Sequence, residues 1–309
     1  MGAEAWDEGV AEAIAAVPAW TGLDAHLTPI TAGITNRNYR VDIGGESFVL
    51  RLSGKNTELL GIDRAAERAA GAAAAAAGVG PEIFAYLPQQ EALVTRFVGG
   101  DHVTEEDLRT ERVLGAVVRS AKAIHACAPV PSTFPVFEIV TDYARIAREH
   151  GVRVPDAYDD AHAFAGWIKG AFDQAPMPLT TCHDDLLNAN FLLEGDHCWI
   201  VDYEYAGMGD LFFDLGNLSI NNNFDEPAQE SLLRLYFGEV GDVHRARLAL
   251  MRVVSDFREA MWGVVQQALS TLDFDYVAYA DRHFARLLAG AQDDRFGAWL
   301  EAAKAPVPA

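Results

Sequence analysis

The segment TCHDDLLNANFLL, residues 181–193, combines a histidine, two adjacent aspartates and two asparagines with apolar residues. A further aspartate, Asp202, follows the apolar run WIV. We expect NFLL and CWIV to pair as a hairpin across EGDH, which would bring Asp185 and Asn190 close to Asp202. Two carboxylates and an amide in one place suit phosphoryl transfer, in which a protein mainly positions groups and neutralises charge.

Each of these three side chains has a place in that chemistry. Asp185 would accept or orient the proton of an attacking hydroxyl, while Asn190 and Asp202 would hold Mg²⁺ against the phosphates of a nucleotide. The alternative is that these are turn and cap residues, because Asp and Asn are favoured in turns. We interpret Asp184 and Asn188 in that way, whereas the other three, in their strand contexts, favour catalysis.

The pattern H-x-D-x-x-x-x-N followed by I-V-D resembles the catalytic core of the kinase-like phosphotransferases that act on small molecules. This superfamily includes the aminoglycoside phosphotransferases and the choline and ethanolamine kinases. The resemblance implies that His183 is the motif histidine of the catalytic loop and that Asp185 is the catalytic base. It also implies that Asn190 is a metal ligand and Asp202 the principal metal ligand.

The next segment, DYEYAGMGDLFFDLGN, is similar to the same superfamily, in which D-x-E-Y, G-x-x-D and F-D-L-x-N follow the metal-binding aspartate. On this resemblance Glu204 either binds a second metal ion or organises the loop. Asp210 and Asp214 are expected to be structural, as helix caps or as acceptors for backbone N–H groups.

The segment ITAGITNRNYRV, residues 30–41, resembles the nucleotide loop of the same superfamily. It is not a P-loop, because it lacks G-K-[ST]. Gly33 and its polar neighbour Asn36 would let backbone N–H groups approach a phosphate, although a plain hairpin turn explains the same residues as well.

Arg51 lies within the strand-like run VLRLSG, where the protein kinases have a lysine and the choline kinases an arginine. An arginine on an apolar strand needs a carboxylate or phosphate partner, and Glu67 matches the ion-pair glutamate of the family. The alternative is an edge residue whose head group reaches solvent.

The run VTRFV resembles the hinge that presents backbone groups of Arg96 and Val98 to adenine. Leu50, Val94, Phe97 and Leu192 are candidates for apolar walls, although plain core is the preferred interpretation for each.

The segment DFREAMWGVVQQALSTLDFDYVAYADRHFARLL resembles the helices that close over the amine in choline and ethanolamine kinases. On that match Trp262, Tyr279 and Tyr205 line the acceptor pocket, because aromatic faces attract ammonium groups. Plain core packing is the alternative for aromatic residues on amphipathic helices. Glu259 stands where the eukaryotic choline kinases have another tryptophan, and Asn221 lies near the position of one of their carboxylates. A carboxylate at Glu259 suits an amine that donates hydrogen bonds.

The elements that must position these residues divide the chain in two. Residues 24–100 read as a hairpin around Gly44 and Gly45, an Ala-rich helix closed by GVGP, and a second pair of strands. From about Thr104 onward the pattern is mostly helical. We therefore predict an α+β, two-lobed protein-kinase-like fold, with a small β-rich nucleotide-binding lobe over residues 1–98 and a larger helical lobe, catalytic and acceptor-binding, over residues 99–309.

Composition limits the partners of this protein. The chain has 309 residues, and 24 Lys plus Arg stand against 45 Asp plus Glu, so its formal net charge of −21 would repel nucleic acid or an anionic membrane. A cationic partner or a metal ion fits better, although acidity that only serves solubility is an equal alternative. No apolar run reaches the roughly 18 residues that would span a bilayer. The three cysteines show no C-x-x-C spacing, so we expect neither a disulfide framework nor a zinc site. The reducing cytoplasm is therefore the expected location of the protein.

Together these features predict an ATP- and Mg²⁺-dependent kinase that phosphorylates the hydroxyl of a small cationic amino alcohol, with choline or ethanolamine first, and that is a monomer or a homodimer. A thiamine or aminoglycoside kinase of the same superfamily is the nearer alternative. A catalytically silent nucleotide-binding scaffold is the alternative from another class.

Overall fold

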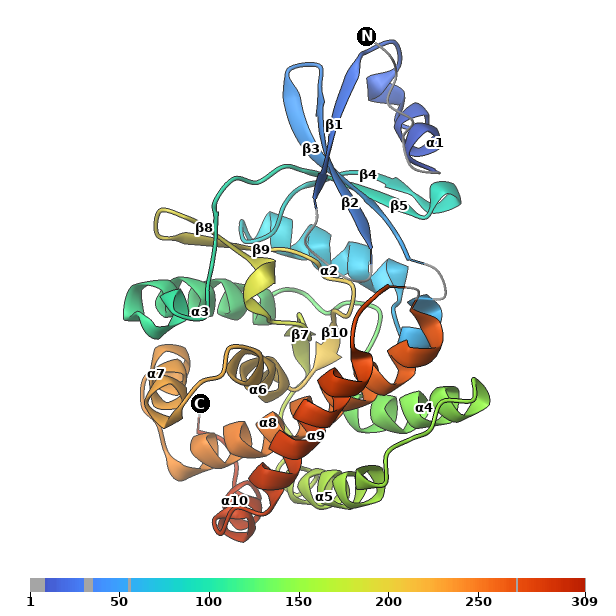
Figure 1. Ribbon diagram of the computed structural model, residues 1–309. Coiled ribbons are helices and arrows are strands. Elements are labelled where there is room, and N and C mark those ends of the chain that lie inside the picture. The colour runs from blue at the N-terminus through green and yellow to red at the C-terminus, as the bar shows by residue number, and fades with distance from the viewer. Residues whose placement is uncertain (1–8, 31–35, 55–56, 271, 309) are drawn as a thin grey trace.

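The computed structural model describes residues 9–30, 36–54, 57–270 and 272–308. A β-rich part built from the first third of the chain lies against a larger helical part (Figure 1). Its antiparallel sheet has the strand order β1-β2-β3-β5-β4. The strands are β1 Ala25–Ile30, β2 Arg37–Ile43, β3 Glu46–Leu52, β4 Ile83–Leu87 and β5 Ala92–Arg96.

The hairpin of β2 and β3 confirms the turn expected at the glycine pair. Gly44 and Gly45 have φ of 62° and 83°, and such a two-residue turn needs positive φ at both positions. Val41, Phe48 and Leu50 alternate toward one face of the sheet, where they pack with Trp20 and with helix α1, Val10–Ala15. The opposite face of the sheet is left for the cleft described below.

The Ala-rich segment is a packed helix, α2, Arg64–Ala76, as predicted. Asp63 caps it by accepting hydrogen bonds from the N–H groups of Ala65 and Ala66. Ala70 and Ala74 are buried, and they belong to the hydrophobic cluster of the helical part rather than to that of the sheet. The β-rich part and the helical part are therefore held together by the packing of α2 as well as by the covalent connection between them.

The helical part surrounds the long helix α8, Asp242–Leu269, which packs against α4, α6, α9 and α10. Helices α8 and α9 lie side by side (Figure 1). The other helices are α3 Glu111–His125, α4 Val136–Glu149, α5 Ala157–Phe172, α6 Leu211–Asn221, α7 Glu226–Phe237, α9 Tyr276–Ala291 and α10 Phe296–Ala302.

The start of the helical pattern was placed too early at Thr104, since α3 begins at Glu111. The side chain and N–H of Thr104 hydrogen-bond to Asp107, whose own N–H donates to the Thr104 hydroxyl. These reciprocal bonds resemble a capping box and precede the short 3-10 turn Asp107–Arg109, which separates Thr104 from α3. Thr110 then caps α3.

Short strands hold the polar segment of residues 181–193. β8, Phe191–Glu194, pairs with β9, His197–Ile200, which confirms the predicted hairpin. β6, Asp101–His102, adds to β8 on its other side. β7, Thr180–Cys182, pairs with β10, Gly207–Gly209. The loops after β7 and β9 therefore emerge close together.

Candidate active site

The loop between β7 and β8 brings Asp185 and Asn190 together. The side-chain amide of Asn190 donates to the backbone carbonyl of Asp185 at 3.0 Å and lies 3.5 Å from its carboxylate Oδ2. Asp202 follows β9 with φ of 68°, and the backbone N–H of the preceding Val201 donates to the Asn190 carbonyl. The three residues line one cleft.

Asp214, at the start of α6, holds the backbone of this loop. Its carboxylate accepts the N–H groups of His183 and Asp184, at 2.9 and 2.7 Å, and it lies 2.9 Å from Nε2 of His125. Burial would raise the pKa of Asp214, but the hydrogen bond and charge of His125 lower it overall. His125, Cys182 and Asp214 lie close enough to share a metal ion, but these bonds already use both oxygens of Asp214. The structural role expected for Asp214 fits these contacts.

His183 lies behind the cleft. It is fully buried, its Nε2 donates to the carbonyl of Val201 at 3.0 Å, and it is absent from the described cleft lining. Burial lowers its pKa. His183 was predicted as part of the catalytic set from the motif. Its hydrogen bond ties the loop of Asp185 to the end of β9, and its side chain lies too deep to contact a substrate in the cleft.

Asp184 differs from the simple turn residue that was predicted. Its φ of 63° is the left-handed conformation of many turns, but its side chain is fully buried, and the backbone N–H of Gly207 is the one donor among the described residues that approaches its carboxyl group, outside ordinary hydrogen-bond geometry. Burial and the charge of Asp214 raise the pKa of Asp184 well above its ordinary value. A neutral carboxylic acid fits this position.

Asp202 and Glu204 crowd the cleft with negative charge. Burial, and then the charge of Asp202, raises the pKa of Glu204 to about 7, while Asn36 donates to its Oε2 at 2.9 Å. Burial raises the pKa of Asp185 well above its ordinary value, and the charges of Glu259 and Asp202 add to that effect. Mg²⁺ prefers carboxylate and amide oxygens, so Asn190, Asp202 and Glu204 suit it, and its charge would relieve this repulsion.

Arg51 joins the sheet, helix α2 and the loop of Asp202. It forms an ion pair with Glu67, and its Nη1 donates to Oδ1 of Asp202 at 2.8 Å. Arg64 also pairs with Glu67, at 2.8 Å, and lies 3.8 Å from Glu204. Since Arg51 is only 8% exposed, the alternative of an edge residue reaching solvent is wrong. The predicted pairing of Arg51 with Glu67 is present.

The cleft has a volume of about 880 Å³, within the size range of small-molecule sites. Arg96, Phe97, Val98 and Leu192 line it, whereas Gly33 lies outside the described residues. The backbone N–H of Arg96 donates to the carbonyl of Glu82, which leaves Val98 as the better backbone contact for a base.

Two of the four candidates for apolar walls are core residues, which was the preferred interpretation. Leu50 and Val94 are fully buried in the sheet's cluster with Trp20. Their neighbours Val49 and Leu93 line the cleft instead. Successive residues of a strand point to opposite faces, and the alternation alone does not say which face meets the cleft.

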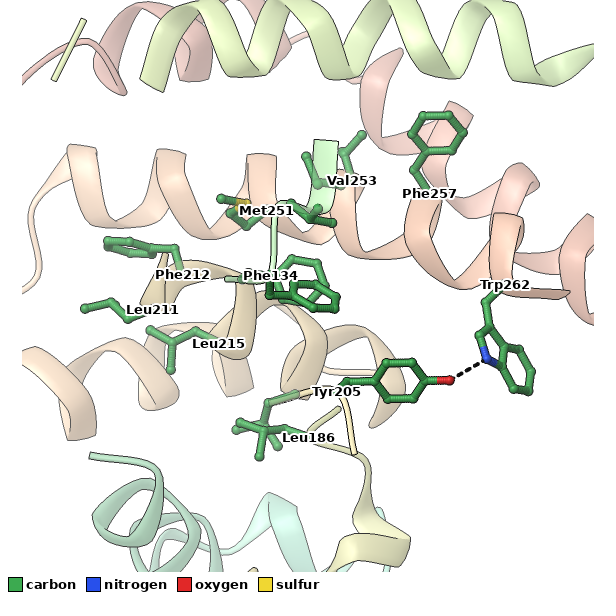
Figure 2. Packing of buried hydrophobic residues seen from close by; sticks show 14 of the residues in the cluster. Phe134, Leu186, Tyr205, Leu211, Phe212, Leu215, Met251, Val253, Phe257 and Trp262 are labelled. Atoms are coloured by element: carbon green, nitrogen blue, oxygen red, sulfur yellow. Dashed lines mark hydrogen bonds between the residues drawn. The ribbon is translucent and has the colours of Figure 1, made fainter. Parts of the chain in front are cut away.

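The residues predicted for the acceptor pocket lie at the same cleft. Trp262, Tyr279, Tyr205 and Glu259 all line it. The indole Nε1 of Trp262 donates to the hydroxyl of Tyr205 at 2.9 Å (Figure 2), and the hydroxyl of Tyr279 donates to Glu259 at 2.7 Å. Trp262 also belongs to the buried core, so packing and cleft lining are combined in one side chain.

Comparison with known proteins identifies the family of this chain. Residues 26–251 match the model of the phosphotransferase enzyme family. The chain also resembles the crystal structure of a choline/ethanolamine kinase family protein from Mesorhizobium loti, with 34% identity, a TM-score of 0.81, and coverage of 96% of this chain and 99% of that one. The chain belongs to this family of phosphotransferases. The resemblance inferred from the catalytic motif is thereby confirmed.

Other relatives support the same assignment. Mouse (Mus musculus) ethanolamine kinase 2 is 27% identical over 299 residues, which covers 85% of this chain and 75% of that protein. A structure of choline kinase LicA from Streptococcus pneumoniae, at 18% identity, has a TM-score of 0.75 over 89% of this chain and 95% of that one, and it supports the fold. The phosphotransferase is thus a small-molecule kinase with the predicted two-lobed, kinase-like fold.

One residue of the phosphotransferase's cleft escaped the sequence analysis. Arg258 on α8 is 1% exposed, and its Nη1 lies 2.8 Å from Glu259 and 3.7 Å from Oδ1 of Asp185. Its guanidinium carbon lies 4.2 Å from the centre of the Tyr205 ring. The available signal was position, because Arg258 lies one helical turn before Trp262 and therefore on the same face of the helix.

No helix among the described residues has both the length and the apolar character needed to cross a bilayer.

Proposed function

We propose that the phosphotransferase transfers the γ-phosphoryl group of ATP to the hydroxyl of a small amino alcohol. The observation that carries this proposal is the meeting of Asp185, Asn190 and Asp202 with Arg51 at one cleft. The acceptor oxygen bonds to the γ-phosphorus, the bond from that phosphorus to the bridging oxygen breaks, ADP leaves, and Asp185 takes the hydroxyl proton.

Each role in this phosphoryl transfer has a residue in the proposal. Asn190 and Asp202, with Glu204 beside them, hold Mg²⁺, which would neutralise charge on the phosphates. Arg51, braced by Glu67, contacts the phosphates, and Val98 contacts the base through its backbone. We also propose the lobe boundary between residues 98 and 99, since β5 ends at Arg96 and β6 pairs with β8 of the helical part.

Ethanolamine and choline are the first acceptors to test, because relatives of this chain are named for both. The test measures ADP release with ethanolamine, choline, thiamine and an aminoglycoside. If an acceptor outside the amino alcohols is preferred, the nearer alternative replaces this proposal. If no acceptor leads to ADP release and Mg·ATP does not stabilise the fold, the alternative of a catalytically silent protein is favoured over this proposal. Cytoplasmic location and oligomeric state stay predictions.

Replacing the base tests the mechanism. Asp185→Asn should lower turnover by about 10²- to 10⁴-fold, the usual contribution of a general base, without loss of folding. Asp184→Asn is the matched control, since Asp184 is adjacent in sequence yet faces away from the cleft. Equal turnover of Asp185→Asn and the wild type would exclude Asp185 as the base.

A further inference from the structure

The carboxylate of Asp185 has polar neighbours on two sides. Its Oδ1 forms an ion pair with Nη1 of Arg258 at 3.7 Å, and its Oδ2 lies 3.5 Å from the side-chain amide of Asn190. Among the described residues, Arg258 is the one cation that pairs with Asp185. Asn190 belongs to the same loop as Asp185, whereas Arg258 lies on helix α8. The direction of the Asp185 side chain therefore depends on α8 as well as on its own loop.

Arg258 itself is fixed by its surroundings. It is 1% exposed, and the same Nη1 that faces Asp185 donates to Oε1 of Glu259 at 2.8 Å. The guanidinium carbon lies 4.2 Å from the ring centre of Tyr205, whose hydroxyl accepts the indole N–H of Trp262 at 2.9 Å. A buried guanidinium held by an ion pair and an aromatic face has little freedom to rotate. Arg258 can thus keep Asp185 in one orientation.

Glu259 is the counter-anion of Arg258. Besides the bond from Arg258, its Oε1 accepts the amide of Asn217 on α6 at 3.2 Å. Its Oε2 accepts the hydroxyl of Tyr279 on α9 at 2.7 Å, and Glu259 as a whole is 4% exposed. A buried carboxylate with both oxygens engaged balances the charge of the buried arginine beside it. Helices α6 and α9 therefore help to fix Arg258 on α8.

Arg258 has no free edge for a ligand in the cleft. Its Nε and Nη2 are buried, and its Nη1 is shared between Glu259 and Asp185. A substrate group would have to displace one of these carboxylates before it could contact the guanidinium. The geometry therefore favours action through Asp185 over contact with a substrate.

We propose that Arg258 is a positioning residue for phosphoryl transfer, which holds the Asp185 carboxylate toward the acceptor hydroxyl and is itself held by Glu259. An ionised carboxylate offers about four lone-pair sites, so pairing of Oδ1 with Arg258 leaves room for the hydroxyl proton. Displacement of a reacting group by about 1 Å can lower a rate about a hundredfold. This inference rests on the proposed function, because Arg258 acts only through Asp185 as the base.

A double-mutant cycle tests whether Arg258 acts through Asp185. Arg258→Met, Asp185→Asn and the double variant are compared by ADP release with Mg·ATP and the best acceptor of the wild type. Arg258→Met alone should lower kcat by about ten- to a hundredfold, but by less than about threefold in the Asp185→Asn background, where the ion pair is already lost. Equal losses in both backgrounds would show that Arg258 acts independently of Asp185, and would overturn the proposal.

Nucleotide binding separates positioning of Asp185 from a general disturbance of the cleft. In Arg258→Met the KM for ATP should stay within about threefold of the wild-type value. Mg·ATP should also raise the melting temperatures of Arg258→Met and the wild type by similar amounts. Loss of the Mg·ATP shift in Arg258→Met would mean that Arg258 supports nucleotide binding, and would contradict a role limited to Asp185.

Two further variants separate the charge of Arg258 from folding. Arg258→Met leaves the charge of Glu259 buried and unpaired, so a paired variant that adds Glu259→Gln removes both charges. The paired variant should fold, and its kcat should fall at least as far as that of Arg258→Met. Arg258→Lys keeps a cation and should exceed Arg258→Met in kcat by at least about threefold. Wild-type kcat in the paired variant, or equal kcat of Arg258→Lys and Arg258→Met, would contradict the proposal.

Arg252→Met is the control on the same helix, because Arg252 bonds to Ser219 and Phe224, away from the cleft. Its kcat should stay within about twofold of the wild-type value. If the wild type releases no ADP with any acceptor, the proposed function fails and this inference fails with it. If the wild type is active and Arg258→Met retains its kcat, this inference alone is wrong.

Discussion

At the scale of single residues, a buried carboxyl group holds the backbone conformation of the loop that carries Asp185. Asp214 fixes the backbone of His183 and Asp184, and His183 ties that loop to the end of β9. The positive φ of Asp184 and Asp202 shows that the backbone turns sharply just before Asp185 and again after β9. Buried polar groups thus set the directions of Asp185 and Asp202.

Asp184 should make the stability of the fold depend on pH. Its pKa is raised in the folded protein, so folding takes up a proton above about pH 4, and stability falls as pH rises from there through the folded pKa. Asp184→Asn keeps the shape of the neutral acid and tolerates positive φ. From pH 5 to pH 8 the melting temperature of Asp184→Asn should therefore fall less than that of the wild type.

The control for that experiment is Asp159→Asn, which changes an exposed aspartate on α5. Its melting temperature should follow the wild type across the same pH range. Parallel curves for Asp184→Asn and the wild type would mean that Asp184 is ionised in the folded protein.

Arg51 should matter for the nucleotide more than for the fold. Arg51→Met removes the group that bridges Glu67 and Asp202, and we expect kcat/KM for ATP to fall by about tenfold or more. Arg40→Met serves as control, because Arg40 lies on the neighbouring strand β2, pairs with Asp42 and does not line the cleft. Steady-state kinetics with varied ATP would contradict this role if both variants behaved alike.

At the scale of elements, the close approach of α6 to α8 fixes the position of α8. The residues of α8 that line the predicted acceptor pocket are positioned with it. Gly216 on α6 lies against the backbone of α8, where an added Cβ would come within 2.8 Å of the Met251 carbonyl carbon. A side chain at this position forces the two helices apart. The spacing of α6 and α8 in turn determines how Asn217 meets Glu259.

Gly216→Ala should therefore destabilise the protein by about 1–3 kcal/mol, as measured by denaturant unfolding. Gly166→Ala is the matched control on α5, since nothing lies within 4 Å of its added Cβ. There the methyl group should stabilise the helix by about 0.5–1 kcal/mol, because alanine loses less backbone entropy than glycine. Similar effects at both positions would show that α6 can move away from α8.

At the scale of the whole molecule, the cleft lies where two hydrophobic clusters meet. One cluster holds the sheet and α1, and the other holds α2 with the helical part. Residues of both parts line the cleft, so a ligand bound there contacts both and binds only the folded state. Ligand binding should therefore stabilise the β-rich part and the helical part together.

Mg·ATP should accordingly stabilise the folded protein, by about 2.7 kcal/mol at a concentration one hundred times its Kd. Removing Mg²⁺ with a chelator should reduce the shift in melting temperature. Asp202→Asn should lose most of the difference between ATP with and without Mg²⁺. If Mg²⁺ changes the shift equally in Asp202→Asn and the wild type, Asp202 does not hold the metal.

The amino-acid sequence by itself determined the local elements and the candidate catalytic residues. Glycine pairs, strand alternation and the spacing of Asp185, Asn190 and Asp202 are short-range features, and the hairpin of β8 and β9 follows from them. The ion pair of Arg51 with Glu67 was also predictable, because a buried arginine needs a partner.

Only the tertiary structure decided which faces meet across the cleft. Alternation marks two faces of a strand, yet Val49 and not Leu50 turned out to face the site. Helical spacing places Arg258 beside Trp262, but its contact with Asp185 joins two distant segments that packing alone brings together. Contacts of this kind depend on how the elements pack, and a local pattern carries no information about what lies opposite.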